Sequence, residues 1–368
     1  MKAASSIRGA VAVSRGRRRA GIACAIALAG LAGLPSLSVA QSPPASETAT
    51  DRAAPAIVLV LPLESATFGR AAEAVKAGFA AAARAAKVDY AVVAHGDDDV
   101  LGAFARARDG GARVIVGPLV RDDIRAIAGA GAPLPWTIAL NQLDDGTAVP
   151  DRVYTLTLAV DADARQIARR MRADGVQTVA VIGSDAPLQK RFANAFVGEW
   201  ILQGGGPPAT YRLDRATDML VLLRRELART APDAVLLALD GADAALVKPY
   251  AGQAPAYASS LVNDRLPPES LRDVDDVRFV ETTWLAEPDA PFLARLPRPD
   301  YANAALDRLY ALGIDALRVA QAFVDGAPEQ LAFDGATGRV ILEASRQFDR
   351  QGRLMQFRGG HAAPLNGP

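Results

Sequence analysis

Ile57-Val58-Leu59-Val60-Leu61 is a run of five apolar residues that ends at Pro62. A strand that is apolar at every position is typical of a parallel sheet whose two faces are both covered by helices. A short loop follows the run, and then an Ala-rich amphipathic stretch predicts a helix at 70–86. This first strand and helix indicate an α/β protein.

The same alternation of apolar runs and Ala-rich stretches continues along the chain. Its first part predicts further strands at 88–94, 114–116, 137–140 and 153–157, with helices at 100–108 and 122–128. The pattern then restarts and predicts helices at 161–173, 188–203, 216–229 and 241–251, with strands at 178–182, 209–213, 234–239 and 256–259. Two similar blocks joined by a crossing segment indicate two doubly wound, Rossmann-like lobes around a cleft.

The last quarter of the chain is less regular. It predicts a strand at 278–284 and a long helix at 303–324. Asp334-Gly335-Ala336-Thr337-Gly338, followed by apolar runs at 339–342 and 353–357, predicts a β-hairpin that ends the chain. We therefore assign residues 57–155 and about 278–325 to lobe 1, and residues 156–260 and about 331–360 to lobe 2.

The first forty residues have the pattern of a secretory signal peptide, because six basic residues precede an apolar run at 21–34 and then Ser38-Val39-Ala40. That run has about fourteen residues, whereas a transmembrane helix needs roughly twenty. We expect cleavage after Ala40, a periplasmic location and no transmembrane segment after removal of the leader, with the Sec and twin-arginine routes both open. Residues 41–56 are rich in Pro, Ser, Thr and Ala and predict a flexible linker.

Charge and cysteine content exclude several classes of function. The chain has 41 basic and 41 acidic residues, and six of the basic ones lie in residues 1–40, which leaves 35 against 41 in the mature chain. An acidic chain without a basic block lacks the clustered Lys and Arg that nucleic acid requires. The one cysteine, Cys24, lies in the leader before most of the apolar run, so we expect no disulfide and find a lipid anchor unsupported.

The sequence contains few histidines and cysteines, residue types that often act in catalysis. The histidines are His95 and His361, and the mature chain has no cysteine, so no Cys-His or Ser-His-Asp arrangement has an obvious base. Phosphate-loop, dinucleotide-binding and nucleophile-elbow motifs do not occur in the sequence. We expect no enzymatic activity, no cofactor and no metal site.

Polar and small residues follow the predicted strands of both lobes. Parallel sheets bind ligands at the carboxyl ends of their strands, near helix N-termini, and such residues can hold the ammonium and carboxylate of an amino-acid-like ligand. The same residue types also serve as ordinary helix caps and turns. The candidate cleft residues are Glu64, Ser65, Thr67, Phe68, Gly117, Pro118, Asn141, Ser184, Asp185, Asp240 and Ser259.

A second candidate binding region is the irregular segment around the Pro-rich stretch 288–299. Aromatic side chains are enriched at the energetic centres of protein interfaces, although in loops they also serve as packing anchors. The aromatic residues concerned are Tyr250, Trp284, Phe292 and Tyr301.

Several stretches that together span nearly all of residues 57–360 carry a resemblance to a known family. They are Val58–Leu63, Phe68–Phe79, Val116–Leu119, Ile138–Asn141, Arg191–Phe196 with Trp200, Arg308–Ala316, Asp334–Gly338 and Phe357–Gly360. In these stretches the chain resembles the LppC family, the C-terminal domain of the penicillin-binding protein activator lipoproteins. Two departures from the family pattern are expected here, the absence of a lipobox and of the long helical-repeat domain of the full-length activators.

The resemblance implies a type I periplasmic-binding-protein fold. It also implies a non-enzymatic role in peptidoglycan synthesis through contact with a penicillin-binding protein. The alternative is a soluble solute-binding protein of an ABC importer for amino acids or similar small molecules, which has the same fold and uses the cleft as its binding site.

Overall fold

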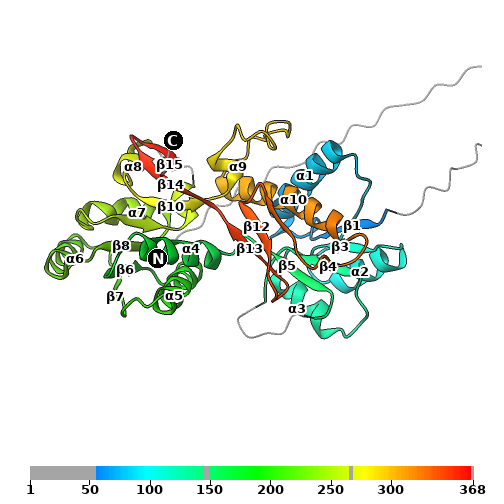
Figure 1. Cartoon of the computed structure of the whole chain (residues 1–368), viewed down its shortest axis with the longest axis horizontal. Helices are drawn as coiled ribbons and strands as arrows, with labels where there is room; N and C mark the ends of the chain where they lie inside the picture. The colour runs from blue at the N-terminus through cyan, green and yellow to red at the C-terminus, as the bar shows by residue number, and fades with distance from the viewer. Residues whose placement is uncertain (1–54, 144–149, 265–267, 366–368) are drawn as a thin grey trace, which may run out of the picture. The chain divides into compact units, whose positions relative to one another are not determined.

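The computed structural model describes residues 55–143, 150–264 and 268–365 (Figure 1). The predicted leader at 1–40 and most of the predicted linker at 41–56 lie outside the described residues. Within them, the chain forms two sheets, each combining parallel strands with an antiparallel border. The two-lobed α/β fold is thereby confirmed.

The first sheet has the strand order β11-β12-β13-β5-β4-β3-β1-β2. Its parallel part consists of β1 (Ile57–Leu61), β2 (Ala91–Ala94), β3 (Val114–Val116), β4 (Trp136–Ala139) and β5 (Val153–Leu156). β13 (Gln347–Gln351) pairs parallel to β5, and β12 (Arg339–Leu342) and β11 (Ala332–Asp334) continue the sheet as antiparallel strands.

The second sheet has the strand order β15-β14-β10-β9-β8-β6-β7. Its parallel strands are β6 (Val179–Gly183), β7 (Ala209–Arg212), β8 (Ala234–Ala238), β9 (Ala256–Ala258) and β10 (Arg278–Glu281). β14 (Arg353–Arg358) and β15 (His361–Pro364) close the sheet as antiparallel strands.

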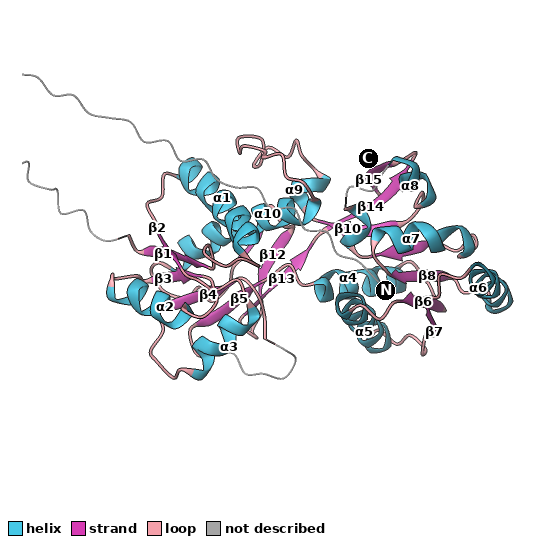
Figure 2. Ribbon diagram, turned by 180° about the vertical axis from the view of Figure 1, so that it is seen from behind, coloured by secondary structure: helices cyan, strands magenta, loops and turns pink. Residues whose placement is uncertain are grey.

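Helices lie between the strands along the chain, as Figure 2 shows in cyan. The segment between β1 and β5 contains α1 (Gly69–Ala86), α2 (Val100–Asp109) and α3 (Arg121–Gly129). Between β5 and β10 lie α4 (Val160–Ala173), α5 (Pro187–Leu202), α6 (Thr217–Thr230), α7 (Gly241–Val247) and α8 (Pro268–Asp273), with short 3-10 turns at Lys248–Tyr250 and Ser260–Asn263. After β10 come α9 (Thr283–Ala286) and α10 (Ala304–Phe323).

Both faces of β1 are buried, as its uninterrupted apolar sequence predicted. Leu59 and Leu61 contact one core layer, which contains Phe79 of α1, whereas Val58 and Val60 contact a separate layer formed with α2. All five residues of β1 are at most 5% exposed. Alternate residues of the strand therefore face helices on opposite sides of the sheet.

α1 and α10 pack side by side in Figures 1 and 2, and two glycines allow their backbones to approach closely. A Cβ atom on Gly78 would lie 1.9 Å from the carbonyl oxygen of Tyr310, and one on Gly313 would lie 2.1 Å from that of Val75. Any larger residue at either position would push the helices apart. This contact attaches α10 to the first sheet.

The last quarter of the chain crosses between the sheets more often than its sequence predicted. β10 belongs to the second sheet although we expected 278–325 in lobe 1, and β11, β12 and β13 belong to the first sheet although we expected 331–360 in lobe 2. The predicted terminal hairpin is wrong, because β12 pairs with β11 and β13 while β14 pairs with β10 and β15. The chain changes sheets at Gly352, a crossing that apolar periodicity does not reveal.

Within residues 55–143, 150–264 and 268–365, no helix has both the length and the apolar character needed to cross a membrane.

Candidate functional site

The loops after β1, β3 and β4 meet at one edge of the first sheet, because these strands are parallel neighbours. Ser65 is buried there, and its hydroxyl accepts backbone N–H bonds from Thr67 at 3.2 Å and from Phe68 at 3.0 Å. Glu64, Thr67 and Phe68 are exposed. The Ser65 hydroxyl is therefore used by the turn that begins α1.

The candidates after β3 and β4 are also bonded to the neighbouring backbone. Gly117, which precedes the buried Pro118, has a φ of 121°, and a Cβ atom there would lie 2.0 Å from a carbonyl oxygen of β1. Asn141 donates from Nδ2 to the carbonyl oxygen of Leu119 at 3.1 Å and accepts at Oδ1 from the N–H of Gln142 at 2.9 Å. Both polar atoms of Asn141 thus fix the local chain.

In the second sheet, Ser184 and Asp185 follow β6. Ser184 is half-buried, and the exposed carboxylate of Asp185 forms ion pairs with Lys190, at 2.9 Å, and with Arg212. The hydrogen bond from Lys190, together with the charge of Arg212, lowers the pKa of Asp185 below its ordinary value. The carboxylate is negative at neutral pH and already has two cationic partners.

Asp240 and Ser259 follow β8 and β9 at the same edge. Asp240 caps α7, since its Oδ1 accepts from the N–H of Asp243 at 2.9 Å. Ser259 is fully buried, and its hydroxyl oxygen has no hydrogen-bond partner in the part of the chain that the structure describes. Ser259 is thus the buried candidate whose polar group is still free to meet a ligand or a water molecule.

A cavity of about 510 Å³ lies beside Asp185. Arg191 forms an ion pair with Asp161 across it at 2.8 Å, whereas Arg165 has no ion-pair or hydrogen-bond partner among the described residues. The side chains that line it include Asp161, Arg165, Asp185, Pro187, Lys190, Arg191 and Asn194. Three cations and two anions line this space, so it suits a small anionic group better than a cation.

Arg165 also borders a second cavity, of about 270 Å³, between the start of α4 and the turn before β13. Its lining includes Gln142, Thr157, Arg165, Arg169, Ser345 and Asp349. The prediction of cleft residues considered strand ends alone and therefore missed Arg165, which lies more than one turn inside α4.

Arg308 of α10 and Glu281 at the end of β10 form a buried ion pair, with 7% and 1% of each residue exposed. The Arg308 Nε and Nη2 atoms donate to the two carboxylate oxygens at 3.0 and 2.8 Å, and Nη2 also donates to the carbonyl oxygen of Ser260 at 2.8 Å. Glu281 accepts further from the Thr282 N–H at 2.8 Å and from Asn263 Nδ2 at 3.0 Å. Burial alone would lower the pKa of Arg308, but Glu281 raises it above its ordinary value.

A second buried ion pair joins Arg350 of β13 to Asp163 of α4. Arg350 also donates to the carbonyl oxygen of Thr337 at 3.2 Å. Asp315 of α10 accepts from the N–H groups of Ala336 and Thr337 at 2.7 Å each and from the Thr337 hydroxyl at 2.6 Å. Burial raises the pKa of Asp315 to about 6, while these hydrogen bonds act in the opposite direction.

These residues form what we call the buried network, defined as Asp163, Glu281, Arg308, Asp315, Thr337 and Arg350. Each of its two ion pairs joins an element attached to the first sheet, α10 or β13, to an element of the second lobe, β10 or α4. At the crossing between the sheets, Gln166 of α4 bonds both the N–H and the carbonyl oxygen of Gly352, at 3.0 and 2.8 Å. Separating the lobes here would leave buried charges unpaired, which is costly.

Comparison with known proteins gives the family of the chain. The family model described as "LppC putative lipoprotein" matches residues 49–218 and 208–360. The chain belongs to the LppC family.

Its curated LppC relatives include the penicillin-binding protein activator LpoA of Escherichia coli strain K12, which is 24% identical over 313 residues, with 72% of this chain and 45% of the relative covered. The protein of the same name from Edwardsiella piscicida is 25% identical over 310 residues, with 71% and 44% covered. This chain therefore spans less than half the length of the curated relatives it matches.

Two solved structures are similar to this LppC chain. One, from Chromobacterium violaceum and described as a "putative branched-chain amino acid ABC transporter", is 34% identical with a TM-score of 0.72, and 81% of this chain and 98% of that chain are covered. The C-domain of LpoA from Haemophilus influenzae, described as a regulator of PBP1A, is 22% identical with a TM-score of 0.73, and 84% and 99% are covered. The second likeness shows the type I binding-protein fold.

The stretches that carry the LppC resemblance supply much of the buried network. Arg308–Ala316 contains both Arg308 and Asp315. Asp334–Gly338 contains Thr337, which donates to Asp315 and whose carbonyl oxygen accepts from Arg350. The resemblance was thus the available signal for the network, because neither the composition nor the spacing of these residues indicated it.

The aromatic segment around residues 288–299 is largely packed against the protein itself. Trp284 is 1% exposed, and its ring centre lies 5.0 Å from that of Tyr310, which Tyr301 also contacts at 6.1 Å. Arg298 stacks on Trp284 at 3.9 Å. Phe292 is 45% exposed, so it is the aromatic ring of this segment most accessible to a partner.

Proposed function

We propose that this chain is a non-enzymatic periplasmic protein that activates or regulates peptidoglycan synthesis by contacting a penicillin-binding protein. Its membership of the LppC family, with LpoA activators among its relatives, carries this proposal. The predicted signal peptide at 1–40 and linker at 41–56 are part of it, because they would deliver the folded chain to the compartment in which such a synthase works.

The strand ends support protein recognition over solute capture. Ser65, Asn141 and Asp240 direct their polar atoms to nearby backbone, and Asp185 is already ion-paired. A small polar ligand needs several converging free donors and acceptors, whereas the donors and acceptors of these residues already bond to the protein itself.

The decisive experiment measures glycan polymerisation by a purified bifunctional penicillin-binding protein with and without the mature chain. We expect binding in a pull-down and an increased rate. Absence of both binding and rate change would refute the proposal. An unrelated solute-binding protein of the same fold serves as the control for nonspecific stimulation.

The second candidate function is that of a solute-binding protein of an ABC importer for amino acids or similar molecules. The 34% identity to the Chromobacterium violaceum protein favours it, as does the cavity of about 510 Å³ lined by Arg165, Lys190 and Arg191. A ligand that binds only the folded state raises the melting temperature. A rise with one amino acid of a panel, abolished by Arg165→Ala, would support this function, and no rise with any of them would oppose it.

A further inference from the structure

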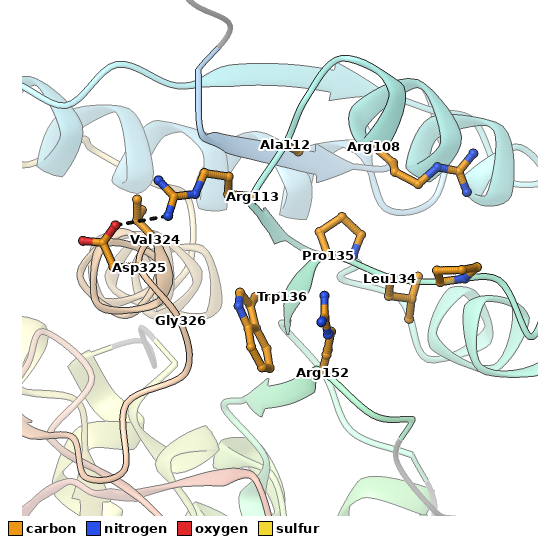
Figure 3. A pocket seen from close by; sticks show the side chains of 11 residues that line it. Arg108, Ala112, Arg113, Leu134, Pro135, Trp136, Arg152, Val324, Asp325 and Gly326 are labelled. Carbon is orange, nitrogen blue, oxygen red and sulfur yellow. Dashed lines mark hydrogen bonds and ion pairs between the residues drawn. The ribbon is translucent and has the colours of Figure 1, made fainter.

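The first sheet has a groove at its amino edge, opposite the strand ends considered above. One cavity of this groove, of about 430 Å³, lies where β3, β4 and β5 begin. Figure 3 shows the Trp136 ring and the Arg152 guanidinium between the Arg113–Asp325 ion pair and the segment Leu134–Pro135. None of the candidate cleft residues lines it.

Two neighbouring cavities extend this groove. They measure about 450 and 150 Å³, and both share Leu134 and the flanking Pro133 with the first cavity. The smaller one has an apolar wall that includes Phe104 and Leu101, and Leu101 is 48% exposed. We call the whole the amino-edge groove, defined by Leu101, Arg108, Arg113, Leu134, Trp136 and Arg152. Its three cavities, which share Pro133 and Leu134, suit an extended chain better than a single compact molecule.

The arginines of the groove form few and exposed ion pairs with the protein itself. Arg152 stacks over Trp136 at 5.0 Å and has no ion pair with any carboxylate of the described chain. Arg113 pairs at 3.1 Å with Asp325, whose side chain is 94% exposed, and Arg108 pairs with its sequence neighbour Asp109 at 3.0 Å. Exposed ion pairs of this kind contribute little and exchange partners readily. A partner that brings its own carboxylates can therefore bind all three guanidinium groups.

We propose that the amino-edge groove binds an acidic, extended peptide segment of a protein partner. Carboxylates of the segment contact Arg152 and Arg113, and an apolar side chain lies beside Leu134 and Leu101. Arg and Trp are the side chains that most often carry binding energy at protein interfaces, and here they are neighbours. That the partner is a penicillin-binding protein rests on the proposed function, whereas peptide binding is testable without it.

Trp136 offers a direct readout. The chain has three tryptophans, and Trp200 and Trp284 are 0% and 1% exposed, so Trp136 alone is accessible to quenchers. The probes are peptides of about twelve residues that cover the periplasmic sequence of a bifunctional penicillin-binding protein, each with a version in which lysine replaces its acidic residues. We expect acidic peptides to protect Trp136 from the neutral quencher acrylamide and their lysine versions not to. Equal protection by both, or protection by neither, overturns the proposal.

Charge reversal identifies the site. We expect Arg152→Glu to weaken binding of the acidic peptides, and of the whole synthase, by about tenfold, as for a central interface arginine. The matched control is Arg225→Glu on α6, an exposed arginine that also has no ion pair among the described residues. Unchanged peptide binding by Arg152→Glu, or an equal loss of binding with Arg225→Glu, would refute the proposal that the amino-edge groove binds the peptide.

The two proposals can fail separately. If the wild-type chain binds acidic peptides but no synthase, the groove stands and the proposed function is wrong. If the wild-type chain and Arg152→Glu bind the synthase equally well, the proposed function stands and the groove is not its docking site.

Discussion

Two caps at the strand ends, Ser65 and Asp240, differ from the buried network in how far along the chain their partners lie. Asp240 bonds an N–H three residues away, and Ser65 bonds residues two and three positions away. Glu281 and Arg308 are 27 residues apart, and Asp163 and Arg350 are 187 residues apart. Ser65 and Asp240 therefore shape single turns, whereas the network joins elements of both sheets.

This difference indicates at which polar groups a substitution should lower the free energy of unfolding most. A cap at the surface can be replaced by water, because water also bonds the exposed N–H group. A buried ion pair has no such substitute, and removing one partner leaves a charge in a poorly solvated place. Substitutions in the two regions should thus separate clearly in their effect on the free energy of unfolding.

The largest effect is expected from Arg308→Ala or Glu281→Ala. Either change leaves one buried charge unpaired, and we expect the free energy of unfolding to fall by about 3–5 kcal/mol in urea denaturation. The control is the double variant Arg308→Met/Glu281→Leu, which removes both charges and should recover most of the loss. If the single variants lose less than the Asp240 variant described below, the network does not stabilise the junction of the lobes.

Asp315→Asn should have the next largest effect. Asp315 accepts three hydrogen bonds, and an amide nitrogen in place of one oxygen would face the Thr337 N–H and hydroxyl donors. We expect a loss of about 2–3 kcal/mol in the free energy of unfolding. Thr337→Val removes the hydroxyl alone and should cost about 1 kcal/mol. A loss in Thr337→Val equal to that in Asp315→Asn would mean that the backbone bonds to Asp315 contribute nothing.

Much of the fold could be predicted from sequence, because strands such as β1 and β3 are uninterrupted apolar runs and are recognised locally. The crossing at Gly352 could not, because a change of sheet leaves no periodicity. Residues of the strand ends could be placed, but the hydrogen bonds of Ser65 and Asn141 to neighbouring backbone depended on the geometry of their loops. The Arg308–Glu281 pair could not be predicted from composition or spacing, because nothing local distinguishes a buried charge from an exposed one.

The pH dependence of stability tests the burial of Asp315. An aspartate in an unfolded chain has a pKa of about 3.9, whereas burial raises that of folded Asp315 to about 6. The folded state thus binds the proton of Asp315 more tightly than the unfolded chain does. The resulting contribution to the free energy of unfolding is complete below about pH 4 and is lost as the pH rises through about 6. The stability of the wild type minus that of Asp315→Asn should therefore decrease between pH 4 and pH 7. An increase would show that the three hydrogen bonds to the carboxylate outweigh its burial.

The smallest effect is expected at the strand end after β8. Asp240→Ala removes the cap of α7 and should lower the free energy of unfolding by about 1 kcal/mol, because the Asp243 N–H then bonds to water. Asp240→Asn keeps an oxygen acceptor and should behave like the wild type. The same two variants distinguish a cap from a ligand contact, since loss of a cap leaves an amino-acid-dependent rise in melting temperature unchanged while loss of a ligand contact does not. If Asp240→Asn abolishes an amino-acid-dependent rise in melting temperature yet unfolds like the wild type, the strand ends are a binding site and the division between local caps and long-range network fails.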